Sequence, residues 1–518
     1  MKREINTTQP GDFKKAVSLD SKITATYNGY YPEDYKTSID VIDVPNTEKE
    51  KLNFFDKYVL RRKPCKIIGV SSEGFPLKEL QFENIKNTLN ENEILQIEKK
   101  ANGGFGSGNK RLKLKFGEFI DEITKNQQTD LYLTTQYYED DPENGNYSSD
   151  EEEKDQIIDE KFNTNFSDNE SLVNLNDLHD DFDELEQCNG NSEDEENVED
   201  QIIEDQLRLK ELYQPPMTNL VKTLPETPDF LDYLIPQQIN LWVGATSKQD
   251  NINFTESFKP DSSDKWMGLG RNIPGDGSSS GLHHDHADNL YIPIDGYKRF
   301  TLFSPGDAAK MYLVGDIKRV FNSGLIDYIH NEKAPFWREL RADGAIVAET
   351  YKKILNDKSI ELDDKQKNEY EDFVRKDFLA STELTDKGTL NTDPASFSTI
   401  PPSFIHLDEI ENEVTKKAMD ELIDKKWPLF KKANRIEVNV KPGEMLYLPT
   451  GWFHEVTSYG ADNKKIKNKN NVHVSVNYWF IPPDGNSIEN IYANADNYWP
   501  TDYKRTKEAL KRIREAVK

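Results

Sequence analysis

Alternating apolar and polar residues predict β-strands in three stretches of the chain. They are "DNLYIPIDGYKRFTLF" (288–303), "NRIEVNVKPGEMLYLP" (434–449) and "NVHVSVNYWFIPP" (471–483). Successive side chains of a strand point to opposite faces, so apolar residues at every second position mark a strand with one buried face. In the first stretch, Asp295-Gly296 joins two such runs and suits a two-residue type I′ turn, which predicts a hairpin.

Helical periodicity dominates elsewhere. The stretch "TEKEKLNFFDKYVLRRKPCKIIGV" (47–70) predicts a short amphipathic helix that ends before Pro64 and leads into a strand at 65–70. The side chains expected to be buried by this helix are Leu52, Phe55 and Val59. Residues 306–434 are mostly helical in pattern, and residues 501–517 predict a basic C-terminal helix. The apolar stripe of that last helix consists of Leu510, Ile513 and Val517.

These patterns predict a mainly β fold with surrounding helices, preceded by an α/β N-terminal part with a helix near 115–124 and a strand near 130–138. The expected organisation in chain order is an N-terminal α/β segment (1–139), an insertion (140–200), a β-domain (206–498) that contains the helical insertion 306–434, and a C-terminal helix (499–518).

Most of the net charge of -28 lies in the insertion. Residues 140–200 hold 24 acidic side chains, and their basic side chains are Lys154 and Lys161. Such a segment cannot bury enough apolar surface to offset the entropy lost on ordering, so we expect it to be disordered. It either aids solubility or, through serines placed before acidic clusters at 148–153 and 192–196, takes part in regulation; we favour the first.

Cysteine content and hydropathy bear on the compartment. Cys65 and Cys188 are too few for a disulfide framework or a zinc ribbon, which favours a reducing environment. The opening "MKREINTTQPGDFKK" lacks the apolar region of a signal peptide, and no run of about 18 apolar residues occurs. We expect a soluble intracellular protein, cytoplasmic, nuclear or both.

The glycine-rich stretch "GGFGSGNKR" (103–111) resembles a phosphate-binding loop in composition alone. Lys110 comes one position late, and Arg111 stands where the motif requires serine or threonine. We interpret the stretch as a flexible loop.

The stretch "GLHHDHADNLYIPIDGYKRF" (281–300) holds three of the eight histidines. A His-x-Asp pair occurs four times in the chain, so the pair alone is a weak sign of a metal site. The pair at His179 falls in the acidic insertion, and the pair at His406 follows two prolines in a predicted loop. The remaining pairs, which directly precede a predicted strand, are His283 with Asp285 and His286 with Asp288.

Side-chain alternation separates these two pairs. With a two-residue turn, Pro293 lies opposite Lys298, and cross-strand partners share a face of the sheet. One face then carries His283, Asp285, Asn289, Tyr291 and Lys298, and the other carries His284, His286 and Asp288. The first grouping is chemically coherent, because an imidazole and a carboxylate can hold a metal while a lysine deeper in the same concavity neutralises an anion.

A third ligand should come from a different strand. The stretch "GEMLYLPTGWFHEVTS" (443–458) supplies His454 after a Pro-Thr-Gly turn. Two histidines and one carboxylate with open positions describe the facial triad of non-haem Fe(II) oxygenases. Zinc would bind the same three groups, so the residue types alone leave the metal open.

The pieces "HHDHADN", "DGYKRFTLFSP", "GEMLYLPTGWFHEV" and "VSVNYWF" resemble those of one family in order and spacing. Over roughly residues 206–498 the chain is similar to the jumonji-C (JmjC) oxygenases of the cupin type, close to the small hydroxylase branch that includes the asparaginyl hydroxylase of hypoxia-inducible factor. This resemblance implies a double-stranded β-helix, also called a jelly-roll or cupin barrel.

The resemblance also implies roles for individual residues. The Fe(II) ligands would be His283, Asp285 and His454, and Lys298 would pair with the distal carboxylate of 2-oxoglutarate. The positions that match the lining of the cosubstrate pocket are Asn289, Tyr291 and Asn477, and Ser280 matches a hydroxyl residue that touches the carboxylate. The family reaction uses O2 and 2-oxoglutarate and yields succinate and CO2.

We therefore expect a 2-oxoglutarate- and Fe(II)-dependent dioxygenase that hydroxylates a protein side chain. Lysine demethylation, including on histones, shares the iron site, but such enzymes often carry glutamate at the position of Asp285 and zinc-binding chromatin readers, for which two cysteines are too few. A tRNA-base hydroxylase would need a basic surface, which the net charge disfavours. A catalytically silent acidic scaffold for basic proteins is opposed by the intact triad.

The acidity favours a basic protein partner and argues against nucleic acid, and nothing in the sequence indicates a membrane. The stripe on the C-terminal helix can pair with a second copy or pack on the barrel, and we favour a homodimer through this helix. The helical insertion and the lysine-rich stretch "GADNKKIKNKNNV" (460–472) can border the active-site mouth. Substrate identity therefore does not follow from the resemblance.

Overall fold

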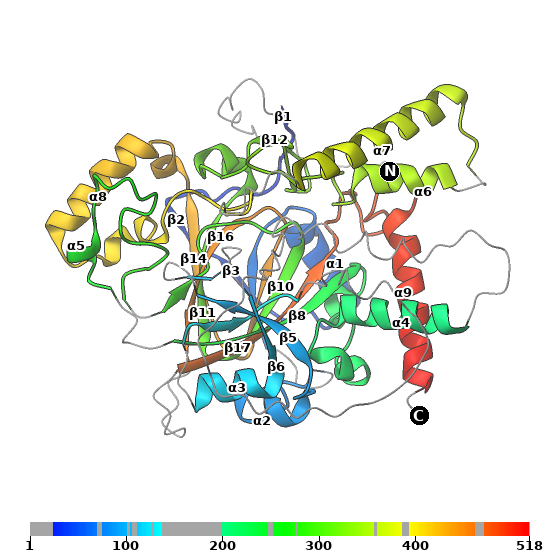
Figure 1. The fold of residues 1–518 in the computed structure, drawn as a ribbon, viewed down its shortest axis with the longest axis horizontal. Coiled ribbons are helices and arrows are strands. Elements are labelled where there is room, and N and C mark those ends of the chain that lie inside the picture. Colours follow the sequence, from blue (N-terminus) through cyan, green and yellow to red (C-terminus); the bar gives the residue numbers. More distant parts are fainter. Residues whose placement is uncertain are drawn as a thin grey trace, which may run out of the picture.

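Two β-sheets enclose a common interior in the computed structural model of this chain (Figure 1). The structure describes residues 24–69, 75–100, 104–105, 111–125, 129–136, 198–246, 252–275, 277–356, 360–385, 393–460 and 471–516. The architecture is the predicted jelly-roll, mainly β with helices around it, and this confirms the expected fold class.

The larger sheet contains β3 (Asp40–Asp43), β4 (Cys65–Ile68), β5 (Ile94–Lys99), β6 (Arg111–Lys115), β7 (Leu131–Leu133), β8 (Pro236–Thr246), β10 (Asp288–Asp295), β15 (Glu444–Leu448) and β17 (Asn471–Phe480), in the order β3-β4-β15-β10-β17-β8-β7-β5-β6. The smaller sheet contains β2 (Lys36–Thr37), β9 (Ser278–Ser279), β11 (Tyr297–Phe303), β14 (Arg435–Val440) and β16 (Phe453–Tyr459), in the order β2-β14-β11-β16-β9. A short third sheet joins β1 (Thr24–Ala25), β12 (Ile317–Val320) and β13 (Ile326–Tyr328).

The α-helices are α1 (Glu48–Phe54), α2 (Phe82–Thr88), α3 (Phe116–Thr124), α4 (Val198–Leu212), α5 (Phe254–Ser257), α6 (Val347–Asn356), α7 (Asp364–Thr385), α8 (Glu413–Lys426) and α9 (Tyr498–Ala516). The predicted helical insertion contains α6, α7 and α8, and it also contains β12 and β13, which its sequence pattern did not predict. In Figure 1, α8 lies beside α5 at one side of the barrel, and α6 lies beside α7 at the other.

The N-terminal part is built into the larger sheet. Strands β3 and β4 extend one edge of that sheet, and β5, β6 and β7 extend the other. Because β7 pairs directly with β8, N-terminal side chains can reach the interior of the barrel. The expected α/β segment therefore supplies part of the barrel wall.

Helix α1 begins at a capping box. The N–H of Glu50 donates to Thr47 Oγ1 at 3.3 Å, and the N–H of Thr47 donates to Glu50 Oε2 at 3.0 Å. The helix continues into a π-helical turn at Phe55–Val59, which changes the residues that face the core. Phe55 and Val59 are buried as predicted, but Leu52 is 46% exposed, so its predicted burial was wrong.

The predicted hairpin at residues 288–303 was also wrong. Strand β10 pairs with β15 and β17, whereas β11 pairs with β14 and β16 in the other sheet. Gly296, with φ of +71°, carries the chain from one sheet to the other. Since β10 and β11 lie in opposite walls of the barrel, Tyr291 and Lys298 both line its interior without being cross-strand neighbours.

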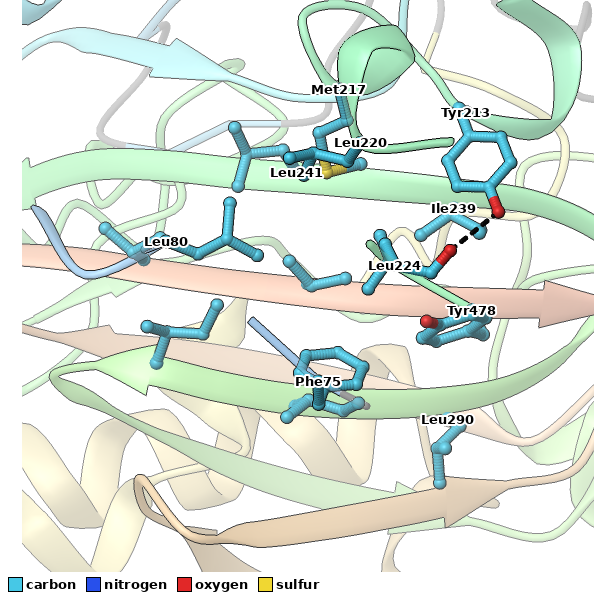
Figure 2. Packing of buried hydrophobic residues seen from close by; sticks show 14 of the residues in the cluster. Phe75, Leu80, Tyr213, Met217, Leu220, Leu224, Ile239, Leu241, Leu290 and Tyr478 are labelled. Atoms are coloured by element: carbon cyan, nitrogen blue, oxygen red, sulfur yellow. Dashed lines mark hydrogen bonds between the residues drawn. The ribbon is translucent and has the colours of Figure 1, made fainter. Parts of the chain in front are cut away.

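The main hydrophobic core covers the outer face of the larger sheet. Leu290 of β10, Leu241 of β8 and Tyr478 of β17 belong to it (Figure 2). They pack with residues that follow α4, including Met217 and Leu220. Because side chains alternate along β10, burial of Leu290 outside directs its neighbours Asn289 and Tyr291 inward.

Helix α9 crosses α4 at one side of the molecule (Figure 1). Leu510 and Ile513 are buried in the same core as Leu209 and Leu212 of α4, and Arg512 pairs with Asp205 at 2.6 Å. Leu510 and Ile513 are thus covered by the chain itself, which corresponds to the alternative in which the helix packs on its own protein; the homodimer stays a prediction. Val517 lies outside the described residues.

Helix α4 begins at Val198, within the segment predicted to be disordered and ahead of residue 206. The rest of the acidic insertion, with His179 and Cys188, lies outside the described residues. Within the part of the chain that the structure describes, no helix has both the length and the apolar character needed to cross a membrane.

Candidate metal and anion site

A cavity of about 140 Å³ lies inside the barrel. Its walls come from both sheets, from the N-terminal part and from Pro394 and Phe397 of the helical insertion. All of the site residues predicted from the sequence line it: Ser280, His283, Asp285, Asn289, Tyr291, Lys298, His454 and Asn477.

His283, Asp285 and His454 form a cluster whose ligand atoms all lie within 4.8 Å of one another. His283 Nε2 is 4.0 Å from Asp285 Oδ1, and His454 Nε2 is 3.6 Å from Asp285 Oδ2. The two histidines are also joined through the backbone, because the N–H of each donates to the carbonyl oxygen of the other, at 3.1 and 2.7 Å. Segments 171 residues apart in sequence thus meet at one point.

Hydrogen bonds fix the tautomers of both imidazoles. His283 Nδ1 lies 3.0 Å from the carbonyl oxygen of Gly281, and His454 Nδ1 lies 2.9 Å from that of Trp452. A carbonyl oxygen can only accept, so Nδ1 carries the hydrogen in each ring and Nε2 keeps a free lone pair. Both Nε2 atoms face the carboxylate of Asp285, which is the arrangement that a divalent cation requires.

Burial shapes the electrostatics of this cluster. Burial lowers the pKa of His283 well below its usual value, and nearby His454 adds to the effect. Burial raises the pKa of Asp285, although His454 and a hydrogen bond from Asn289 oppose the change. Three electron-pair donors therefore converge in a poorly solvated place, where a shared cation would stabilise all of them.

Lys298 is the buried cation of the cavity. It is 1% exposed, and its Nζ donates to Ser458 Oγ at 2.6 Å and to Tyr132 OH at 3.4 Å. Burial lowers the pKa of Lys298 to about 7. Among the residues described, no carboxylate lies within ion-pair distance of this Nζ. An unpaired buried ammonium is costly, so the position fits the carboxylate of a ligand.

Further polar side chains around the cavity are hydrogen-bonded to one another. Asn477 Nδ2 donates to Asn289 Oδ1 at 3.1 Å, and Trp242 Nε1 donates to Asn477 Oδ1 at 2.7 Å. Tyr291 OH donates to Ser475 Oγ at 2.7 Å. Ser280 lies at the wall, but its hydroxyl bonds the backbone of Gly281 and Val456 instead of pointing toward Lys298.

On the opposite face of the 283–288 segment, the side chains contact other protein groups and do not reach the cavity. His284 Nε2 lies 2.5 Å from Tyr328 OH. Asp288 pairs with Arg62 and accepts hydrogen bonds from Tyr447 OH at 2.6 Å and from the N–H of Thr450 at 2.9 Å. His286 packs beside the ring of Trp337. These residues face away from the cavity, as side-chain alternation predicts.

Several lining residues were missed by sequence reasoning. They are Phe105, Tyr132, Trp242, Phe397 and Ser458. Phe105, from the stretch interpreted as a flexible loop, is buried and stacks on Tyr132 with ring centres 4.6 Å apart. Only Ser458 had a usable signal, because it lies four positions after His454 on an alternating strand and so shares its inward face.

His406 lies in a turn between two short 3-10 helices, Pro402–Phe404 and Leu407–Glu409, in agreement with its predicted place in a loop. It is buried on the outer side of the smaller sheet, and its Nε2 lies 2.8 Å from Glu455 Oε2. Burial opposes a charged imidazole, but Glu455 and Glu409 raise the pKa of His406 overall. Its role in the structure is therefore that of an ion-pair partner next to the strand of His454.

A family model described as "Cupin-like domain" matches residues 51–486. The chain belongs to the cupin-like domain family. This cupin-like protein is also 27% identical over 513 residues to "JmjC domain-containing protein 4" of Schizosaccharomyces pombe (strain 972 / ATCC 24843), a match that covers 89% of this chain and 88% of that protein. The predicted cupin-type, JmjC resemblance is confirmed. It extends well ahead of residue 206, consistent with N-terminal strands that complete the larger sheet.

Proposed function

We propose that this cupin-like protein is a 2-oxoglutarate- and Fe(II)-dependent dioxygenase that hydroxylates a protein side chain, with conversion of 2-oxoglutarate to succinate and CO2. One observation carries the proposal: a cluster of two histidines and one carboxylate shares a cavity with the buried ammonium of Lys298, which has no carboxylate partner among the described residues. The three ligand groups would suit zinc as well as iron. The lysine favours a cosubstrate that is itself an anion.

The residues present fit the metal and cosubstrate that the family implies. His283, Asp285 and His454 would hold Fe(II), since the backbone carbonyls bind Nδ1 of each imidazole and leave Nε2 facing the carboxylate. Three protein ligands leave coordination positions open for the keto acid and O2. With its keto acid, the metal supplies the oxidising chemistry that C–H hydroxylation requires.

The side chains of this chain would bind and orient the reactants. Lys298 would pair with the distal carboxylate of 2-oxoglutarate, and Ser458 and Tyr132 hold its ammonium group in place. The hydrogen-bonded side chains of Asn289 and Asn477 would offer polar groups to the part of the ligand between its two ends. Aromatic rings such as Phe300 and Phe397 exclude water from the same cavity.

The size of the cavity supports a macromolecular substrate. Pockets for drug-sized molecules usually measure about 300–1,000 Å³. At about 140 Å³, this cavity leaves little space beside a bound keto acid. A substrate would therefore enter with one extended side chain while its bulk stays outside, as a protein does.

The test is an anaerobic titration of the metal-free protein with Fe(II) and 2-oxoglutarate. We expect a weak visible charge-transfer band, its loss in His454→Ala, and its retention in the control His286→Gln, which alters a histidine on the opposite face. On admission of air, succinate should form. Absence of the band in the wild-type protein, or equal loss in both variants, would contradict the proposal.

A further inference from the structure

Arg271 is a buried arginine behind the wall of the cavity. It is 1% exposed, and its guanidinium joins three separate segments. Nη1 donates to the carbonyl oxygens of Phe105 and of Ser280, the latter at 3.1 Å, and Nη2 donates to Asp393 Oδ1 at 2.9 Å. These acceptors belong to the glycine-rich stretch, to the residues just before His283, and to the part of the helical insertion between α7 and α8.

Phe397 extends this link to a candidate metal ligand. The Arg271 Cζ lies 4.7 Å from the centre of the Phe397 ring. That ring in turn stacks on the imidazole of His283, with centres 4.8 Å apart and planes inclined by 10°. A backbone bridge joins His283 to Phe397 as well. One face of the His283 ring is thus held by a phenyl ring that itself rests on the guanidinium.

Gly104 explains how the glycine-rich stretch comes so close. A Cβ at this position would lie 2.7 Å from Arg271 Cβ and 2.7 Å from the carbonyl oxygen of Ser279. No real side chain tolerates such distances to backbone, so glycine lets the stretch approach the arginine. Gly104, within the stretch that resembled a phosphate loop, therefore serves close packing.

The chemistry of the contact requires arginine. A planar guanidinium can donate in several fixed directions at once, whereas an ammonium group on a flexible chain cannot satisfy the same three acceptors and also stack on a ring. Asp393 has a second partner, Lys265, at 2.9 Å, but that lysine side chain is 59% exposed and contributes little. The ion pair that matters is therefore Arg271–Asp393.

We propose that Arg271 is a positioning residue for the metal site. Together with Asp393 it holds Phe397 against His283, and through Phe105 it closes the N-terminal part onto the same cavity. The helical insertion and the N-terminal part are thereby coupled to the orientation of one imidazole. This inference rests on the proposed function, because it treats His283 as a metal ligand.

The test uses Co(II) alone, whose visible ligand-field bands report both affinity and coordination geometry without any turnover. Purified full-length protein is compared with Arg271→Met, Arg271→Lys and Phe397→Leu. Since residues that orient metal ligands typically contribute about 10–100-fold in affinity, we expect weaker Co(II) binding in this range for both Arg271 variants, with shifted band positions. Phe397→Leu should shift the bands in the same direction with a smaller loss of affinity.

Lys265→Met is the matched control, because it removes the exposed partner of Asp393 and leaves the buried pair intact; its affinity and spectrum should equal those of the wild type. A general loss of stability would lower the amount of folded protein without moving the band positions. If Arg271→Met does not fold, Arg271→Lys and Phe397→Leu decide the question.

Wild-type affinity and bands in the folded variants would overturn the inference. The proposed function fails separately if wild-type protein binds Co(II) in a His454-dependent manner but 2-oxoglutarate does not change the spectrum. Absence of any His454-dependent Co(II) binding would overturn both.

Discussion

The segment from His283 to Asp288 carries the same residue types on two faces, and the two faces have opposite surroundings. On the inner face, His283 and Asp285 meet His454, so that two imidazole Nε2 atoms and a carboxylate converge. On the outer face, His284 bonds the hydroxyl of Tyr328, and Asp288 is enclosed by the donors of Arg62, Tyr447 and Thr450.

The difference shows that a His-x-Asp pair is informative only through the groups that face it. The outer-face acceptors of His284 and Asp288 meet donors, so the role of these two side chains is structural. Inner-face acceptors meet one another, an arrangement that becomes favourable only when a cation is shared. The sharpest test of this interpretation makes the same substitution on each face and compares the effects on metal affinity and on stability.

The largest effect is expected for Asp285→Asn on the inner face. The substitution removes a charge that burial already disfavours, so the metal-free protein should be as stable as wild type or slightly more stable. Metal affinity should fall by about 100-fold or more, and 2-oxoglutarate turnover should drop below detection. A metal titration measures the affinity, and thermal unfolding of the metal-free protein measures the stability. If the Asp285→Asn variant does not fold, the inner face has a structural role instead.

Asp288→Asn on the outer face should show the converse. It leaves the buried guanidinium of Arg62 without its ion-pair partner, so we expect a loss of about 3–5 kcal/mol in the free energy of unfolding. The protein that remains folded should bind metal with an affinity close to that of wild type. Urea unfolding measures the stability, and a metal titration measures the affinity. Wild-type stability in this variant would contradict the structural role assigned to the outer face.

A smaller effect is expected at Lys298, where the affinity for 2-oxoglutarate should depend on pH. Burial lowers the pKa of Lys298 to about 7, so in the empty cavity the ammonium form dominates below pH 7 and the neutral amine above it. A carboxylate ligand requires the ammonium form, so the affinity for 2-oxoglutarate should weaken above pH 7 by up to about tenfold per pH unit. Equilibrium binding between pH 6 and 9 measures this slope. Lys298→Met should bind weakly at every pH with no slope, and an unchanged slope in that variant would assign the titration to another group.

The smallest effect is expected outside the barrel, at the ion pair of His406 and Glu455. The neighbouring carboxylates of Glu455 and Glu409 outweigh burial and raise the pKa of His406 above 6.5, and in the same way His406 lowers the pKa of Glu455 below 4.5. The stabilisation from His406 is therefore complete below pH 6.5 and is lost as the pH rises through its folded-state pKa. The contribution from Glu455 is present above pH 4.5 and is lost as the pH falls.

Thermal unfolding between pH 5.5 and 8.5 tests this pair. The wild-type Tm should decline by a few degrees toward the alkaline end, and His406→Gln should have a lower Tm in acid with a flatter profile. Because Glu455 would remain beside His406, the Glu409→Gln variant should weaken the pH dependence without removing it. A steep profile that survives in His406→Gln would exclude this histidine as the titrating group.

The sequence predicted the side chains of the candidate site and the strands that carry them better than it predicted how those strands pair. Alternation grouped Asp285, Tyr291 and Lys298 on one face, and all three line the cavity. The hairpin on which that grouping relied does not exist, because β10 and β11 belong to different sheets. The grouping survives since opposing walls of a closed barrel both direct alternate side chains inward, whichever partners each strand has.

Residues from distant segments lay beyond the reach of sequence patterns. Tyr132 and Phe105 come from the N-terminal part, and Phe397 comes from the helical insertion, between α7 and α8. Arg271 makes its contacts with residues 166 and 122 positions away in sequence. No periodicity links such positions, because their proximity results from how the chain packs as a whole.

By itself, the sequence determined which residue types were available for chemistry and which of them share a face of a strand, because the direction of a side chain is a local property of the backbone. The tertiary structure alone decided which sheet each strand joins, that His284 and Asp288 find partners, and that Lys298 and the inner histidines are left facing an enclosed space. Those outcomes depend on contacts between residues far apart in the chain, and only the folded barrel brings these residues together.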